Sequence, residues 1–105
     1  MISVTLGTDT KTLDDALSGG WLVEQVHRRR AANFPVCVRI EIKQPPEVNL
    51  VLATPGCPPG QASFRPLMEA EKGVIEFWER LGLNDANWRV DQLVAFLRKL
   101  VRLAA

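Results

Sequence analysis

The sequence contains few of the residues from which most catalytic and metal sites are built. Its 105 residues include one histidine, two cysteines and no tyrosine. No CxxC pair is present, so a metal site has no support, and two cysteines are too few for a disulfide framework. Cys37 and Cys57 could pair in principle, but we expect reduced thiols. The sequence therefore predicts no metal and no cofactor.

Long apolar runs and an excess of charge of one sign are also missing. No stretch approaches the roughly 20 apolar residues of a membrane span, and the first residues lack the layout of a signal peptide. Thirteen Lys and Arg against twelve Asp and Glu give a formal net charge of +1, so no overall field favours nucleic acid or a membrane surface. We expect a cytoplasmic protein with no membrane partner. Nine arginines against four lysines favour a GC-rich bacterial source.

The remaining composition is that of an ordinary globular protein. Hydrophobic residues make up 47% and charged residues 24% of the chain, which argues against disorder. A chain of 105 residues can bury one core but is short for two. We expect residues 1–105 to form a single globular domain.

Alternation of apolar and polar residues predicts three strands. Residues 2–6 alternate in this way, and the segment 7–10 has the composition of a turn that ends the strand. The clearest alternation covers 36–43, and a proline-containing turn separates it from 48–53. The last two segments are expected to form an antiparallel hairpin over 36–53, with an inner face that includes Val38, Ile40, Leu50 and Leu52.

Helical periodicity accounts for most of the rest of the chain. A short helix is expected to break at 18–20, because each of two glycines there costs about 1 kcal/mol relative to alanine. Three prolines make 54–65 a loop. The last two helices carry apolar arcs over about half of their circumference. The expected helices cover 12–17, 21–33, 66–81 and 87–103.

The order β-α-β-β-α-α predicts an α+β fold. The simplest arrangement that buries these surfaces is a small three-stranded sheet with helices packed on one face. The first strand reaches the hairpin through a helical crossover, so we expect it to run parallel to a neighbouring strand.

Two groups of basic residues are candidates for an anion or nucleic-acid contact. Arg28, Arg29 and Arg30 end the second helix, while Arg39 and Lys43 lie on the polar face of the second strand. Arginine matches phosphate geometry well. However, cations stabilise any helix C-terminus, and consecutive helical residues point in different directions. Nucleic acid is therefore an alternative partner that we do not favour.

No constellation of residues points to catalysis. His27 has only Glu24 nearby as an orienting partner, and neither cysteine has a neighbour that would activate its thiol. Glu71 lies near the centre of an apolar arc, where an ionised carboxylate needs a partner. We favour a structural role for Glu71, although a ligand site there or at the loop 54–65 stays open.

The final helix presents a candidate protein interface. Its inward set is expected to be Val90, Leu93, Val94, Leu97 and Val101, which leaves Phe96, Leu100 and Leu103 as an exposed apolar strip. A symmetric dimer would cover this strip; alternatively, the same chain covers Phe96. The leading hypothesis is a non-catalytic protein-interaction or regulatory module with a protein partner or itself. A nucleic-acid-associated accessory protein is the alternative, and a small-ligand binder or small enzyme is the second alternative.

Overall fold

The computed structural model describes residues 1–44, 48–58 and 67–104; the side chains of Gln44, Leu103 and Ala104 are outside this description. Among the helices in these ranges, none has the length and apolar character needed to cross a membrane. The elements in chain order are β1 (Ile2–Leu6), β2 (Asp9–Thr12), α1 (Leu13–Leu17), a 3-10 turn (Ser18–Gly20), α2 (Trp21–Ala31), β3 (Val38–Gln44), β4 (Val48–Ala53), α3 (Glu69–Arg80) and α4 (Val90–Ala104).

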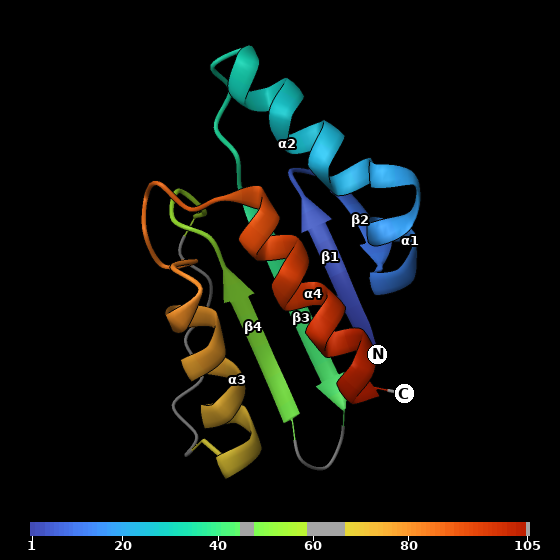
Figure 1. The fold of residues 1–105 in the computed structure, drawn as a ribbon, viewed down its shortest axis with the longest axis vertical. Coiled ribbons are helices and arrows are strands. Elements are labelled where there is room, and N and C mark those ends of the chain that lie inside the picture. Colours follow the sequence, from blue (N-terminus) through green and yellow to red (C-terminus); the bar gives the residue numbers. More distant parts are fainter. Residues whose placement is uncertain (45–47, 59–66, 105) are drawn as a thin grey trace.

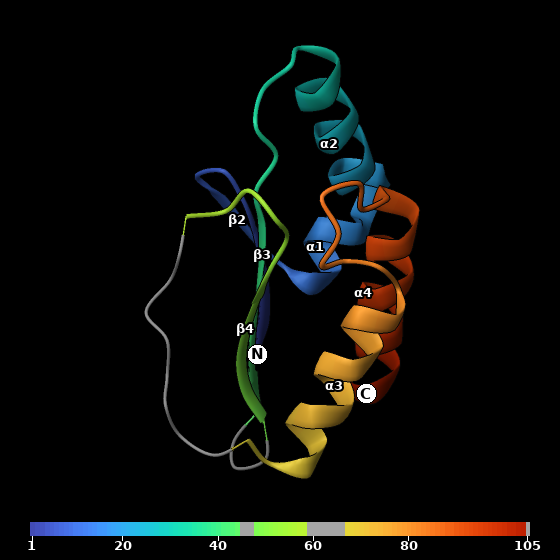
Figure 2. The same cartoon turned by 90° about the vertical axis from the view of Figure 1, so that its left-hand side faces the viewer.

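The fold is α+β, with a layer of helices on one face of an antiparallel sheet (Figures 1 and 2). The sheet has four strands in the order β2-β1-β3-β4. The α+β class is therefore confirmed, and the prediction of three strands is wrong because β2 adds an edge strand next to β1.

β2 is a polar strand that forms a tight hairpin with β1. Leu6 pairs with Asp9, so Gly7 and Thr8 form a two-residue turn. Gly7 has φ +64°, which a glycine in the first turn position tolerates without strain. Only Lys11 in β2 is partly buried. The segment therefore lacks the apolar alternation that identifies a strand in sequence.

This hairpin also explains why the predicted parallel orientation of β1 is wrong. β1 is antiparallel to both β2 and β3. A strand followed directly by a helical crossover would enter the next strand in the same direction. β2 reverses the chain once more before α1 and α2, so β3 enters the sheet opposite to β1.

The β3–β4 hairpin confirms the clearest sequence prediction. Ile40 pairs with Leu52 and Ile42 pairs with Leu50. The four residues predicted for the inner face are all buried, and β3 begins at Val38 rather than at residue 36. The turn residues 45–47 are outside the described part of the chain.

Local sequence signals determine how the first two helices begin. Thr12 caps α1 by accepting a hydrogen bond from the backbone N–H of Asp15 at 3.3 Å. Gly19 and Gly20 have φ values of +62° and +70°, which confirms the predicted break between α1 and α2. α2 lies with α1 on the helical face of the sheet (Figure 2).

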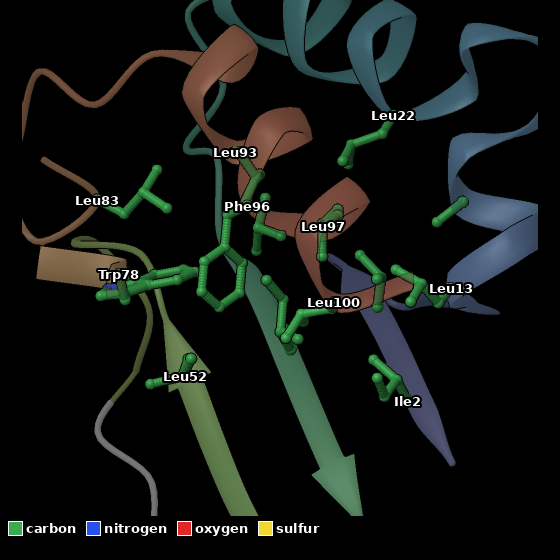
Figure 3. Close-up of a cluster of buried hydrophobic side chains, with 14 of the residues drawn as sticks. Ile2, Leu13, Leu22, Leu52, Trp78, Leu83, Leu93, Phe96, Leu97 and Leu100 are labelled. Carbon is green, nitrogen blue, oxygen red and sulfur yellow. The ribbon is translucent and has the colours of Figure 1, made fainter. Parts of the chain in front are cut away.

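α4 lies over the middle of the sheet, between α3 and the α1–α2 pair (Figure 1). Its buried side chains face the sheet and both neighbouring helices. Phe96 is 1% exposed and packs edge-on against Phe77 and Trp78, with ring centroids 5.7 and 5.1 Å away. Figure 3 shows Phe96 beside Trp78 in the core. Leu100 is 4% exposed and lies in the same core.

The expected direction of the α4 apolar face is therefore wrong in part. Val101, assigned to the inward set, is 36% exposed, and Val94 is only partly buried. Phe96 and Leu100 are covered by their own chain, so they do not form an exposed apolar strip. The side chain of Leu103 is outside the description.

Candidate functional site

The three consecutive arginines of α2 point to three different places. Arg28 pairs with Glu24 at 2.7 Å on the surface. The guanidinium of Arg29 lies against the β1–β2 turn at Gly7, and its Nε atom has no hydrogen-bond partner within the described chain. Arg30 is directed toward Trp88. The structure does not bring these arginines into one anion-binding patch.

Arg30 connects α2 to the segment between α3 and α4. Its Nη2 atom donates a hydrogen bond to the Trp88 carbonyl at 2.8 Å, and its guanidinium lies 4.4 Å from the Trp88 ring centroid. A cation–π contact of this kind contributes about 0.5–1 kcal/mol when exposed. This arginine therefore has a structural role within the chain.

The second basic pair lies on the open face of the sheet, away from the helices. Arg39 donates a hydrogen bond to the Pro58 carbonyl, and Lys43 pairs with Glu41 at 2.8 Å. α2 and its arginines lie on the helical side (Figure 2). The two basic groups consequently do not adjoin on one surface.

The cysteines form a disulfide between Cys37 and Cys57, with Cα atoms 4.8 Å apart. The prediction of reduced thiols is therefore wrong. Two hydrogen bonds between Thr54 and Val38 hold the chain after β4 beside the start of β3. The backbone N–H of Thr54 donates to the Val38 carbonyl at 3.0 Å, and the backbone N–H of Val38 donates to the Thr54 hydroxyl oxygen at 3.1 Å. In the disulfide, neither sulfur is a free nucleophile or metal ligand.

The disulfide also bears on the predicted cytoplasmic location. Stable disulfides are rare in the cytosol, which weighs against that location. The cytoplasmic location stays a prediction.

Glu71 is a fully buried carboxylate with a structural use. Its Oε1 atom accepts the backbone N–H of Met68 at 2.9 Å, and its Oε2 atom accepts the backbone N–H of Asn49 at 2.9 Å. Met68 is the N-cap of α3, and Asn49 is in the edge strand β4. Glu71 thus fixes the start of α3 to the sheet edge, in agreement with the structural role favoured from the sequence.

An apolar groove lies between α3 and α4, on the surface of the helical layer. It has a volume of about 210 Å³ and is open to solvent. We call it the α3–α4 groove. Its lining residues are Ala70, Gly73, Val74, Phe77, Phe96, Lys99 and Leu100.

Gly73 is the residue in this groove that the fold does not explain. It lies in the interior of α3, where glycine is about 1 kcal/mol less favourable than alanine. Its φ is not positive, and a Cβ at this position would meet no atom within 4 Å. Neither backbone geometry nor packing requires glycine here. The sequence signal was available, as an isolated glycine within a strongly amphipathic helix, but the sequence alone could not place it beside a groove.

The rims of the groove carry opposite charges. On α4, Lys99 lines the groove and Arg102 follows one turn later. On α3, Glu69 and Glu76 lie one turn on either side of Gly73 and are exposed. Glu69 pairs with Lys72 at 3.1 Å, whereas Glu76 and Lys99 form no ion pair with any described residue. Lys99 is thus a cation at the edge of an apolar surface and has no ionic partner in the described chain.

Other chemistry has little geometric support in the described ranges. His27 is exposed on α2, and no three His, Cys, Asp or Glu side chains within residues 1–44, 48–58 and 67–104 are grouped so that they could hold a metal ion. Most of the loop 54–65, named above as a candidate ligand contact, is outside the described residues.

Comparisons with protein-family models, curated proteins and solved structures found no match to this chain. We therefore infer the function from the geometry of the described residues.

Proposed function

We propose that this chain is a non-catalytic protein-interaction module, and that its binding surface is the α3–α4 groove. The observation that carries this proposal is Gly73, because it leaves open space beside an apolar surface at a cost in helix stability. A binding role explains this residue, since a Cβ at position 73 would occupy the space that a partner needs.

The size of the groove suits one bulky side chain of a partner. A cavity of about 150 Å³ holds a benzene molecule, so about 210 Å³ accommodates an aromatic or branched aliphatic side chain. Interfaces commonly depend on a few such anchors in well-packed pockets. Leu67 and Met68, just before α3, are 43% and 45% exposed, so apolar side chains are also exposed at the start of the helix that carries Ala70 and Gly73 of the groove.

The nucleic-acid alternative has weaker support. Arg28, Arg30, Arg39 and Lys43 each interact with another group of this chain. Electrostatic binding to a phosphate backbone relies on clustered cations. The basic residues of α4, Arg98, Lys99 and Arg102, are the remaining cluster, and Lys99 lies at the edge of an apolar surface. The α3–α4 groove is apolar, with acidic residues on one rim, and so favours a protein partner.

Affinity capture with three forms of the chain tests the proposal. The baits are the wild type, Gly73→Trp, which fills the groove, and Glu79→Trp, which adds the same side chain to an exposed position of α3 that does not line the groove. Far-ultraviolet circular dichroism establishes that each bait is folded. We expect a protein from the native cells to bind the wild type and Glu79→Trp, with at least a tenfold loss on Gly73→Trp. Equal capture by all three baits would contradict the proposal.

A further inference from the structure

We infer that the α3–α4 groove binds an acidic–apolar segment of another protein, in which a bulky apolar side chain enters the groove and a neighbouring carboxylate pairs with Lys99. This inference rests on the proposed function and deepens it by naming the chemistry of the partner. Three features carry it: the volume and apolar lining of the groove, its open side at Gly73, and the charge on its α4 rim.

Charge complementarity selects the carboxylate. Lys99 lines the groove, and neither Glu76 nor any other described acidic residue forms an ion pair with it. Lys99 lines the groove and Arg102 follows it one turn later on α4, so the α4 rim is positively charged. An acidic group on the partner therefore orients the bound segment with its negative side toward α4 and away from the acidic residues of α3.

The shape of the groove favours a polypeptide segment over a free small molecule. Small-molecule sites usually enclose about 300–1,000 Å³ and bury most of the ligand, whereas this groove holds about 210 Å³ and is open. A side chain presented by a larger surface gains further contacts at the exposed Leu67 and Met68. A free compound would leave those residues uncovered.

A second copy of the chain is a poorer fit for the groove. Phe34 is a prominent exposed apolar residue, at 64% exposure, that could act as an anchor from another copy. The residues before it include Arg29 and Arg30, and no described acidic residue forms an ion pair with either of them, whereas Glu24 pairs only with Arg28. Docking Phe34 would therefore bring cations toward Lys99, where a carboxylate is required.

Fragment binding followed by two-dimensional NMR tests the chemistry of this site. The probe is N-acetylphenylalanine, which has an apolar ring and a carboxylate, and its neutral amide is the matched control. Fragments of this size reach millimolar dissociation constants. We expect the acid to cause saturable shifts of the Gly73, Phe77 and Lys99 amides, and the amide to bind two- to fivefold more weakly, as expected from an exposed ion pair.

Two adjacent residues of α4 provide a matched charge control. Lys99→Glu should abolish the preference for the acid, whereas Arg98→Glu makes the same change in net charge outside the groove and should retain it. Gly73→Trp and, as a second filling variant, Gly73→Leu should remove binding of both fragments. Thermal melts establish that each variant is folded.

The outcomes separate this inference from the proposed function. Equal affinity for the acid and the amide, or equal effects of Lys99→Glu and Arg98→Glu, would overturn the acidic–apolar inference, while capture that depends on Gly73 would still support an interaction surface. Concentration-dependent shifts of the groove amides without a fragment would indicate self-association and would also overturn it. Saturable binding of the acid with loss of preference only in Lys99→Glu would support it.

Discussion

Gly73→Ala is expected to stabilise the protein while it weakens partner binding. Alanine is more favourable than glycine in a helix interior by about 1 kcal/mol. The added methyl group meets no atom within 4 Å, so no steric cost offsets this gain. For a domain of this size, a gain of about 1 kcal/mol raises Tm by roughly 4–8 °C. A substitution that improves stability and reduces function is typical of a binding site.

The assay for Gly73→Ala is a thermal melt beside the wild type, followed by the capture experiment with the same two forms. The methyl group takes up part of the groove, so capture should fall, although less than with Gly73→Trp. A Tm equal to or below that of the wild type would refute the reasoning, because it would mean that the fold itself requires glycine at this position.

Three further changes test the structural assignments by chemical denaturation. Arg30→Ala should lower the free energy of unfolding by about 1–2 kcal/mol, because it removes a hydrogen bond and a cation–π contact. The control Arg28→Ala removes only an exposed ion pair and should lower the free energy of unfolding by less than about 0.5 kcal/mol. Equal losses in the two variants would contradict the structural role of Arg30. Glu71→Gln should cost about 2–4 kcal/mol, because one buried acceptor is replaced by a donor facing an N–H group, whereas the exposed Glu69→Gln should stay within about 0.5 kcal/mol. Reduction of the Cys37–Cys57 disulfide, which closes a loop with a sequence separation of 20, should lower the free energy of unfolding by about 3 kcal/mol. An unchanged urea midpoint after treatment with dithiothreitol would argue against the bond.

The sequence predicted the parts of the fold that have a strong local pattern. The β3–β4 hairpin alternates apolar and polar residues over both strands, and its inner face follows from that alternation. The break at Gly19 and Gly20 follows from their conformational freedom. β2 was missed because an edge strand that buries little apolar surface has no such pattern. Its absence then produced the wrong orientation of β1.

The direction of the α4 apolar face depended on information that a helical wheel does not contain. The wheel identifies the apolar arc, but the neighbouring elements decide which part of the arc is covered. α4 lies between α3 and the α1–α2 pair, so Phe96 and Leu100 are buried and Val101 is left partly exposed. The interface predicted from that arc therefore took Phe96 and Leu100 to be exposed, although both are buried.

The candidate site could be predicted only in fragments. Glu71 was recognised from its position on the wheel, although its backbone partners became apparent only from the contact between α3 and β4. The disulfide was missed because spacing in sequence does not give the distance between two cysteines. The α3–α4 groove joins residues from two helices, so only the packed structure places Gly73 opposite Lys99.

Hydrogen–deuterium exchange of the wild-type chain with its captured protein partner tests the central claim most directly. The account predicts slower exchange of amides in Glu69–Arg80 and Val90–Ala104 on addition of the partner, with little change in the strands. The same partner should cause no such protection in Gly73→Trp. Protection confined to the open face of the sheet, or protection of α3 and α4 that persists in Gly73→Trp, would contradict the assignment of the α3–α4 groove as the binding surface.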